Sequence, residues 1–423
     1  MALRGASRVG RMMTALSVPR PESRLYCDLT QSWSEVGGGV RTYLLRKRQH
    51  ILDRTRHRHL LIIPGPADEV IEDGRSITVR IASPRIPGSP NYRLMLRNRA
   101  VRSALDAFGP DLIECQDAYN LPWAAIGYRN ANPATSLVAC YMTDFPTVYV
   151  QRPLEPLIGK TAASMLSRAG YNYLRKLYNR FDATSALSEA GGAEKLRSIG
   201  VDRVEVMPLG VETGAFSPSR RDPELRRELG LADDEPLLIY AGRLDGEKKP
   251  DLVVDAFRRL PDHLGARLVL LGEGPLRQEI AALGDARILT PGYVSGRDEL
   301  ARWLASADLY VSGMADETFG VSIVEAQASG LGVVGVAAGA MIDRVHPAIG
   351  RIGPVGDPAA MARNILDMLA LDRSAVSKAA RDEAQRYSWD NSMRILFERI
   401  YPAALARTGD SLDEAPEGAA LAA

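Results

Sequence analysis

The chain has 423 residues, of which 46% are hydrophobic and 25% charged, with a formal net charge of +1. A chain of this length exceeds what one hydrophobic core ordinarily organises, so we expect two domains. Its three cysteines are odd in number and lack metal-ligand spacing, which is typical of reduced thiols in a cytoplasmic protein. No apolar run approaches the roughly 18 residues of a membrane-spanning helix, so we expect none.

The first half of the chain alternates apolar runs with helical patterns. Residues 1–22 hold four arginines, and we expect a flexible start there, with organellar targeting as the alternative. The expected buried strands are RLYCDL, HLLIIPG, SITVRIA, DLIECQ and LVACYM. The expected helices span 38–52, 92–108, 156–180 and 189–199. This alternation predicts βαβ units around a parallel sheet.

The second half repeats the pattern after a segment rich in Gly, Pro and Ser at 207–223. Its expected strands are LLIYAG, ARLVLLG, ARIL, DLYVS and GVVGV. The sequence therefore predicts an α/β fold with two Rossmann-like, doubly wound domains that face a cleft. In chain order we expect a flexible start (1–22), an N-terminal domain (23–212), a C-terminal domain (213–385), a returning C-terminal helix (386–405) and a disordered tail (406–423).

Charge is distributed unevenly along the chain. Residues 1–210 hold 29 Lys and Arg against 19 Asp and Glu, a net charge of +10, whereas the remainder holds 24 against 33, or −9. A basic half favours an anionic partner, either a membrane surface or a nucleic acid. The basic runs 152–180 and 93–102 contain apolar residues, as amphipathic helices on anionic membranes do, although an ordinary surface helix is an equal reading. Neither run has a nucleic-acid-binding motif, so we expect no nucleic acid.

Three loops of the second half follow expected strands, where open parallel sheets bind ligands. GRLDGEKK offers Arg243 and Lys248, GEGPL offers Gly272 and Gly274, and the third loop is DETFGVSIVEAQASG. Cations, a glycine turn and a helix N-terminus together suit a diphosphate. Each loop alone also has a structural reading, since Asp-Gly pairs favour turns and GEGPL is not a dinucleotide fingerprint.

The third loop carries two glutamates, Glu317 and Glu325, around an expected helix start near Gly320. Eight helical residues rise about 12 Å, so one carboxylate could reach a sugar ring while the other holds a ribose. Acidic residues near a helix N-terminus are also common for dipole reasons. Spacing alone therefore favours the structural interpretation.

The three loops, in this order, resemble the donor-binding half of retaining GT-B-fold glycosyltransferases of family 4. The resemblance continues through MPLGVETGAFSP, FGPDLIECQDAYN and GGGVRTYL and spans residues 24–404. It implies an N-terminal acceptor domain and a C-terminal nucleotide-sugar donor domain. It also implies catalytic roles for Arg243 and Lys248, which would neutralise the donor diphosphate, and for Glu317, which would contact the donor sugar. The residues implied to bind the donor are Glu325 (ribose), Phe319, Gly320, Val321, Gly38, Gly39, Gly272 and Gly274.

Two features refine what the resemblance implies. The chain contains no Asp-x-Asp, so we expect no metal ion and no other cofactor. In this family the leaving phosphate takes the acceptor's proton on the same face, with Glu317 as a nucleophile the less favoured alternative. YMTDFPTVY resembles the family's YHTDFPxY segment, but Met142 replaces the histidine that touches the donor sugar. Asp144 is either a substitute contact in this acceptor or sugar pocket, or a turn residue before Pro146.

The implied function is retaining transfer of a hexose from a GDP- or UDP-linked sugar to a lipid, glycolipid or glycan acceptor, without a metal. The expected location is cytoplasmic, with peripheral attachment to the inner face of the membrane as an option. A nucleotide-sugar epimerase on the same scaffold is the first alternative. A nucleotide-sugar-binding protein with weak or no transfer is the second.

Overall fold

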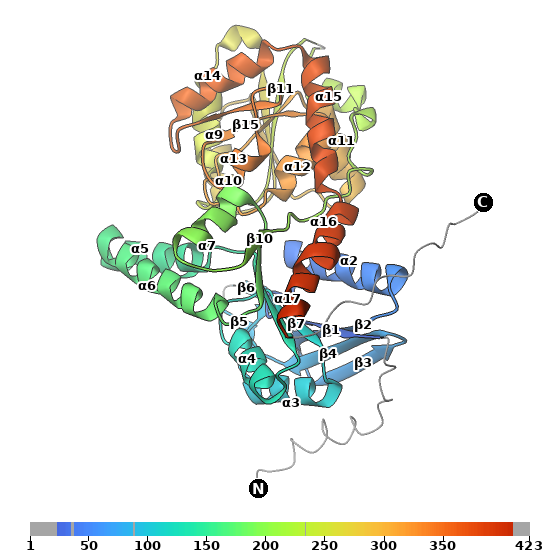
Figure 1. Cartoon of the computed structure of the whole chain (residues 1–423). Coiled ribbons are helices and arrows are strands. Elements are labelled where there is room, and N and C mark those ends of the chain that lie inside the picture. The colour runs from blue at the N-terminus through green and yellow to red at the C-terminus, as the bar shows by residue number, and fades with distance from the viewer. Residues whose placement is uncertain (1–22, 35–37, 88, 233, 409–423) are drawn as a thin grey trace, which may run out of the picture. The chain divides into compact units, whose positions relative to one another are not determined.

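The computed structural model describes residues 23–34, 38–87, 89–232 and 234–408 (Figure 1). These residues form two compact units. The first unit comprises the chain up to Ala186, residues 196–207 and the chain from Met393 onward, and the second comprises residues 187–195 and 208–392. The segment expected to be a flexible start (1–22) lies outside the described residues, as do residues 409–423 of the expected tail.

The first unit is built on an eight-stranded sheet of order β10-β9-β8-β7-β1-β2-β4-β3. Its neighbouring strands are parallel, except that β3 pairs antiparallel with β4 at one edge. Because both faces of the central strands are covered, β1, β7 and β8 are buried throughout and mostly apolar, although β1 and β7 each carry one buried carboxylate, Asp28 and Glu114. The strands are β1 (Leu25–Leu29), β2 (Arg58–Gly65), β3 (Glu69–Asp73), β4 (Ser76–Ala82), β7 (Leu112–Cys115), β8 (Ser136–Tyr141), β9 (Ala183–Ala186) and β10 (Val204–Val206), and a separate hairpin joins β5 (Arg85–Ile86) to β6 (Ser89–Arg93).

The helices of the first unit depart from the expected ranges at two places. The helix expected over 92–108 begins only at Asn98, because residues 89–93 pair as strand β6. The helix expected over 156–180 is two helices, because Gly159 adopts a φ of 81°, which α-helical geometry does not allow. The helices are α2 (Gly39–Arg54), α3 (Asn98–Phe108), α4 (Leu121–Ala131), α5 (Arg152–Ile158), α6 (Lys160–Tyr178), α7 (Glu194–Ser198) and α17 (Tyr401–Arg407), with π-helical turns at η1 (Pro146–Gln151) and η6 (Leu396–Ile400).

The second unit contains a six-stranded, all-parallel sheet of order β13-β12-β11-β14-β15-β16. The strand order reverses between β11 and β14, which makes that position the topological switch point of a Rossmann-like sheet. Every strand expected in this half is present. The strands are β11 (Leu237–Ala241), β12 (Arg267–Leu271), β13 (Ile288–Gly292), β14 (Leu309–Val311), β15 (Gly332–Val336) and β16 (Gly350–Gly353).

Helices cover both faces of this second sheet (Figure 1). Two of them start from clear sequence signals: Asp357 caps α14 by accepting the Ala360 amide, and Pro250 opens α9 at its first position. The helices are α8 (Pro223–Glu228), α9 (Pro250–Phe257), α10 (Leu276–Ala281), α11 (Arg297–Ser306), α12 (Val321–Ala328), α13 (Met341–Arg344), α14 (Pro358–Leu369) and α15 (Arg373–Ala384), with short turns at η2 (Glu189–Ala193), η3 (Pro218–Arg220), η4 (Asp262–Leu264) and η5 (Gln385–Tyr387). The predicted fold class, α/β with two doubly wound domains, is confirmed.

The end of the chain belongs to the first unit. Helix α16 (Trp389–Ile395) spans the boundary at Met393, and α17 packs against β8 and β9. Helix α17 runs to Arg407, so residues 406 and 407, which we expected in a disordered tail, are helical. None of the helices that the structure describes combines the length and hydropathy needed to cross a bilayer.

Candidate functional site

The loops singled out in the second half lie at one edge of the second sheet. Residues 242–249 follow β11, residues 272–275 follow β12, and residues 312–320 follow β14. Because all of these strands are parallel, their carboxyl ends share this edge. The first and third loops flank the switch point, where such sheets bind ligands.

Glu317 and Lys248 meet at this edge. Lys248 Nζ lies 3.1 Å from Glu317 Oε2, and the Gly320 amide donates to Glu317 Oε1 at 3.1 Å. Helix α12 begins at Val321, with Gly320 in the left-handed region at a φ of 83°. Glu317 therefore sits just before the helix N-terminus, as the sequence predicted, with its carboxylate held between an ammonium group and a backbone amide.

The loop after β11 is organised by its own carboxylates. Asp245 Oδ1 accepts the amides of Glu247 at 3.1 Å and Lys248 at 3.0 Å, which folds the loop into a turn. Arg243 forms ion pairs with Asp245 Oδ2 at 2.5 Å and Glu247 Oε2 at 2.9 Å, while its side chain stays 63% exposed. The loop thus presents a solvent-accessible guanidinium that is already oriented by two acidic neighbours.

Gly272 and Gly274 let the first two loops touch backbone to backbone. A Cβ on Gly272 would lie 1.9 Å from the Gly242 carbonyl oxygen, and one on Gly274 would lie 2.2 Å from that of Leu244. Their φ angles of 141° and 158° also disfavour other residues. These glycines therefore have a structural reason to be glycine, and their contact with a donor stays a prediction.

Glu325 lies in the second turn of α12 and is only 8% exposed. Burial raises the pKa of its carboxyl to about 7, and the positive charge of Arg297 opposes that rise. Phe319 turns its ring into the protein beneath the Arg344 guanidinium, 4.7 Å from the ring centroid. Phe319 can therefore offer a ligand its backbone amide but not its side chain, whereas Val321 is half-buried at the helix start.

The remaining predicted residues belong to the first unit. Gly38 and Gly39 open α2 and are exposed, with Gly38 at a φ of 121°. Met142 and Asp144 follow β8, and both are buried. The Asp144 carboxylate accepts hydrogen bonds from the Thr147 hydroxyl at 2.9 Å and the Tyr171 hydroxyl at 2.8 Å. These bonds support the turn-residue reading of Asp144 without testing a contact with a sugar.

Sequence reasoning missed a polar cluster at the switch point of the first sheet. Asp117, which follows β7, accepts the Thr30 hydroxyl at 2.8 Å and the Gln31 amide at 2.6 Å, both of which follow β1. Burial raises the pKa of the Asp117 carboxyl, and these hydrogen bonds oppose the rise. The available signal was the run of polar residues directly after each of these two strands.

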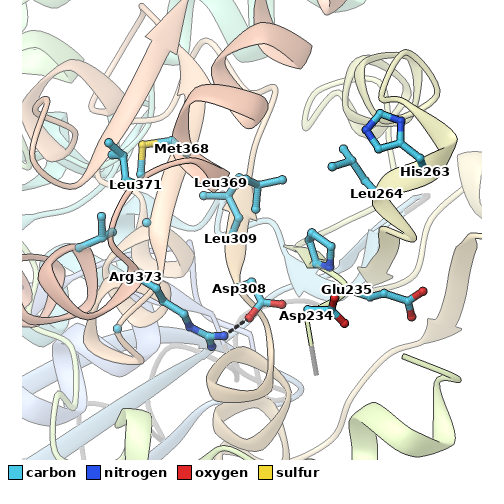
Figure 2. Close-up of a pocket in the computed structure, with 14 residues that line it drawn as sticks. Asp234, Glu235, His263, Leu264, Asp308, Leu309, Met368, Leu369, Leu371 and Arg373 are labelled. Carbon is cyan, nitrogen blue, oxygen red and sulfur yellow. Dashed lines mark ion pairs between the residues drawn. The ribbon is translucent and has the colours of Figure 1, made fainter. Parts of the chain in front are cut away.

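A cavity of about 500 Å³ lies at the opposite, amino edge of the second sheet (Figure 2). Asp308, which directly precedes β14, forms an ion pair with Arg373 in its wall. None of the residues predicted to form the site lines this cavity. The cavity is therefore separate from the loops at the carboxyl edge.

Both halves of the chain match known families. Residues 37–215 match the family Glycosyltransferase Family 4, and residues 221–384 match Glycosyl transferases group 1. A GDP-mannose-dependent alpha-mannosyltransferase of Mycobacterium tuberculosis is 31% identical over 83% of this chain and 89% of its own length. A GDP-mannose-dependent alpha-(1-6)-phosphatidylinositol dimannoside mannosyltransferase of the same species is 27% identical over 89% of this chain and 96% of its own length.

The fold has solved counterparts. The structure of Anabaena Alr3699/HepE in complex with UDP and glucose superimposes with a TM-score of 0.65 at 19% identity, covering 90% of this chain and 99% of that one. That likeness concerns the fold, whereas the mycobacterial relative shares enough sequence to show the family. The chain therefore belongs to the GT-B-fold glycosyltransferases of family 4, and it is a hexosyltransferase that uses a nucleotide sugar.

Proposed function

We propose that the protein transfers a hexose from a GDP- or UDP-linked sugar to a lipid, glycolipid or glycan acceptor, with retention of configuration and without a metal ion. The observation that carries this proposal is the meeting of Lys248, Glu317 and the N-terminus of α12 at the switch point of the second sheet. The named activities of the two mycobacterial relatives support GDP-mannose as donor, and the phosphatidylinositol dimannoside in the name of one of them supports a glycolipid acceptor. The complex of Alr3699/HepE with UDP and glucose supports UDP as the alternative nucleotide.

Two cations and a helix N-terminus provide the charge stabilisation for the leaving group. The Arg243 guanidinium and the Lys248 ammonium would contact the donor diphosphate, alongside the first amides of α12. The carboxylates that pair with them in this structure hold both cations in place before the donor arrives. When Lys248 turns to the diphosphate, the Glu317 carboxylate becomes available to the sugar.

Retention follows from transfer on a single face of the sugar. The bond between the anomeric carbon and the leaving phosphate oxygen breaks, the bond to the acceptor oxygen forms, and the acceptor proton moves to the leaving phosphate. No separate general base is needed. Glu317 is a poor nucleophile because the Gly320 amide, which donates to its Oε1, withdraws charge from the carboxylate. We therefore assign Glu317 to sugar contact.

The first test measures binding of GDP, UDP, GDP-mannose and UDP-glucose through the shift that each causes in the thermal unfolding temperature. At least one nucleotide sugar is expected to stabilise the protein, and Arg243→Ala is expected to weaken its binding about 10- to 100-fold. This range corresponds to the loss of a charged hydrogen bond of about 1.5–3 kcal/mol. Arg227→Ala removes a comparable exposed ion pair with Glu224 on α8 and serves as the matched control.

Three results would contradict these assignments. Unchanged affinity of the Arg243→Ala variant would remove the diphosphate contact. Conversion of the free nucleotide sugar to its epimer, without any acceptor, would favour the epimerase alternative. A requirement for added divalent metal during transfer would overturn the metal-independent mechanism, and inversion at the anomeric carbon, read by NMR of the product, would overturn retention.

The acceptor side is proposed to contact an anionic membrane surface through α5 and α6, which pack against each other in the first unit (Figure 1). Helix α6 buries one face that includes Leu174 and Leu177, as an ordinary surface helix does. That face does not account for Leu157 and Met165, which are 77% and 62% exposed. Exposed apolar residues that also include Ile158 and Leu166 lie among Arg152, Lys160 and Arg168, which suits an interfacial surface.

We expect salt-sensitive binding to vesicles that contain phosphatidylglycerol, and little binding to phosphatidylcholine vesicles, in co-sedimentation at 50 and 500 mM salt. The Leu157→Ser/Met165→Ser variant should bind several-fold more weakly, because it removes two exposed apolar side chains. The Leu283→Ser/Val355→Ser variant makes the same change on exposed residues of the second unit and should bind like the wild type. Failure of the wild-type protein to bind anionic vesicles at low salt would exclude the membrane surface.

A further inference from the structure

Three consecutive carbonyls of the loop before α12 are each held by a hydrogen bond. The Ala340 amide donates to the Glu317 carbonyl at 2.7 Å. The Ser188 hydroxyl donates to the Thr318 carbonyl at 2.8 Å, and Arg344 Nε donates to the Phe319 carbonyl at 3.1 Å. A loop whose carbonyls are fixed one after another has little freedom to rotate its peptide planes.

Ser188 reaches this loop from a distant part of the chain. Residues 187–195 leave β9 of the first unit, join the second unit, and return to the first unit at Leu196. Ser188 is 1% exposed, and its hydroxyl also accepts the Gly191 amide at 3.1 Å, which caps η2. The Ala190 amide donates to the Asp343 carboxylate at 2.9 Å, so η2 is anchored at its own N-terminus.

Arg344 joins the same segment to the loop. Its guanidinium is 3% exposed and donates to the Leu187 carbonyl at 3.2 Å as well as to the Phe319 carbonyl. It also donates to the Tyr387 hydroxyl at 3.2 Å and lies over the rings of Phe319 and Tyr387, at 4.7 and 4.2 Å from their centroids. One buried cation therefore fixes the crossing segment, the loop and η5 to one another.

Two glycines allow the backbones to approach closely enough for these bonds. A Cβ on Gly191 would lie 2.8 Å from the Glu317 carbonyl oxygen and 2.9 Å from the Ala340 nitrogen. A Cβ on Gly339, whose φ is 55°, would lie 2.7 Å from the same carbonyl oxygen. The peptide after Glu317 is thus enclosed by backbone on two sides.

We infer that Ser188 and Arg344 are positioning residues that set the loop which contacts the donor sugar. In a trans peptide the N–H points opposite to the C=O. Fixing the carbonyls of residues 317–319 therefore also fixes the directions in which the amides of Thr318, Phe319 and Gly320 point. The Gly320 amide in turn holds the Glu317 carboxylate. This inference rests on the proposed sugar contact of Glu317, and it adds that a segment following β9 determines where that carboxylate lies.

Ser188→Ala removes one hydrogen bond to the loop and the cap of η2 while leaving Arg243, Lys248 and Glu325 intact. Affinity for GDP or UDP is expected to stay within about twofold of wild type. The additional affinity contributed by the sugar, measured as GDP-mannose against GDP or UDP-glucose against UDP, is expected to be lost. We expect kcat to fall about 10- to 100-fold, since a misplacement of about 1 Å costs on the order of 100-fold.

A direct physical readout does not depend on activity. Hydrogen exchange at the amides of residues 318–320 is expected to be faster in the Ser188→Ala protein than in the wild type. The matched control is Ser392→Ala, because the Ser392 hydroxyl is 1% exposed and also donates to a backbone carbonyl, that of Pro208, at 2.6 Å. The control should lose comparable stability without altering exchange at 318–320 or the sugar contribution.

A second variant, Gly191→Ala, retains the Arg344 side chain but places a Cβ 2.3 Å from Ser188 Oγ and 2.8 Å from the Glu317 carbonyl oxygen. It therefore displaces both groups and is expected to show the same selective loss. If Ser188→Ala and Ser392→Ala behave alike in exchange and in sugar contribution, the inference is overturned. If the wild-type protein binds no nucleotide sugar, the proposed function fails instead, and faster exchange at 318–320 in Ser188→Ala would still show that Ser188 positions the loop.

Discussion

Lys47→Met is expected to lower the free energy of unfolding of the first unit by about 3–5 kcal/mol, because it leaves two buried carboxylates without their cation. Lys47 on α2 is completely buried, with Nζ 2.6 Å from Asp28 Oδ1 and 2.9 Å from Glu114 Oε1. Methionine has a similar length, so it fills the space without replacing the charge. The lost stability is then electrostatic and not the result of a cavity.

The surrounding groups cannot take over the role of Lys47. Burial lowers the pKa of His59, so its imidazole is neutral near pH 7 although Nε2 lies 2.7 Å from Asp28 Oδ2. Burial alone would raise the pKa of Asp28, but Lys47 and His59 outweigh burial and hold that pKa below its usual value. The Tyr401 hydroxyl of α17 donates to Glu114 Oε2 at 2.9 Å. The cluster therefore also ties the last helix to the sheet of the first unit.

The pH dependence of this contribution has a definite sign. A carboxyl whose folded pKa is depressed stabilises the protein above its unfolded pKa of about 3.9, and the contribution is lost as the pH falls through the folded pKa. The Asp28 contribution is therefore complete at neutral pH and lost only in acid. Lys47→Met should remove it across the neutral range, so the difference from wild type should be largest near pH 7.

Urea denaturation, combined with amide exchange on β1 and β7, measures this effect in the first unit alone. Lys176→Met on α6 provides the control, because that lysine is exposed and its replacement should change stability by less than about 0.5 kcal/mol. If the free energy of unfolding of Lys47→Met lies within about 1 kcal/mol of the wild-type value at pH 7, the buried carboxylates find other partners or take up protons without cost.

The sheets were largely predictable because their strands are buried on both faces and read as short apolar runs. The parts that could not be predicted depend on contacts made elsewhere. Gly159 interrupts a pattern that is helical on both sides, and residues 92–93 leave a helical pattern to join strand β6, where Arg93 pairs with Arg85. The hydrophobic periodicity of these segments predicts neither the helix break nor the strand pairing.

The candidate site divides in the same way. Arg243, Lys248, Glu317 and Glu325 could be found because they stand on loops after strands or at a helix start, and the family resemblance gave them roles. Ser188, by contrast, meets Thr318 across 130 positions of sequence, through the path that the chain takes between the units. Such a contact follows from topology, so neither spacing nor composition identifies it.

Glu325→Gln is expected to stabilise the protein in the absence of nucleotide at pH 8 by about 3–4 kcal/mol. Burial raises the pKa of this carboxyl from 4.5 to about 7, and each pKa unit corresponds to about 1.4 kcal/mol. Because the folded pKa is raised, the folded state binds the proton more tightly than the unfolded state. The penalty is therefore complete above about pH 7, shrinks as the pH falls, and disappears below about pH 4.5.

The same carboxylate should make donor binding depend on pH. Ribose hydroxyls donate hydrogen bonds, so the ionised form of Glu325 can accept two of them, whereas the protonated form accepts less well. As the pH drops below 7, the affinity of the wild-type protein for the nucleotide sugar is expected to fall by at most about tenfold for each pH unit. Glu325→Gln should bind more weakly at pH 8 and show little change between pH 6 and pH 9.

Calorimetric titration with GDP-mannose or UDP-glucose is the suitable measurement, because their diphosphates are diesters and do not titrate between pH 6 and pH 9, unlike the terminal phosphates of GDP and UDP. Glu279→Gln, which changes an exposed glutamate on α10, controls for the loss of one negative charge from the second unit. It should alter neither stability nor the pH profile appreciably. A wild-type affinity that is constant from pH 6 to pH 9, together with normal binding by Glu325→Gln, would remove Glu325 from the ribose site. The buried carboxylate at the second turn of α12 would then be a cost to folding that nucleotide binding does not explain.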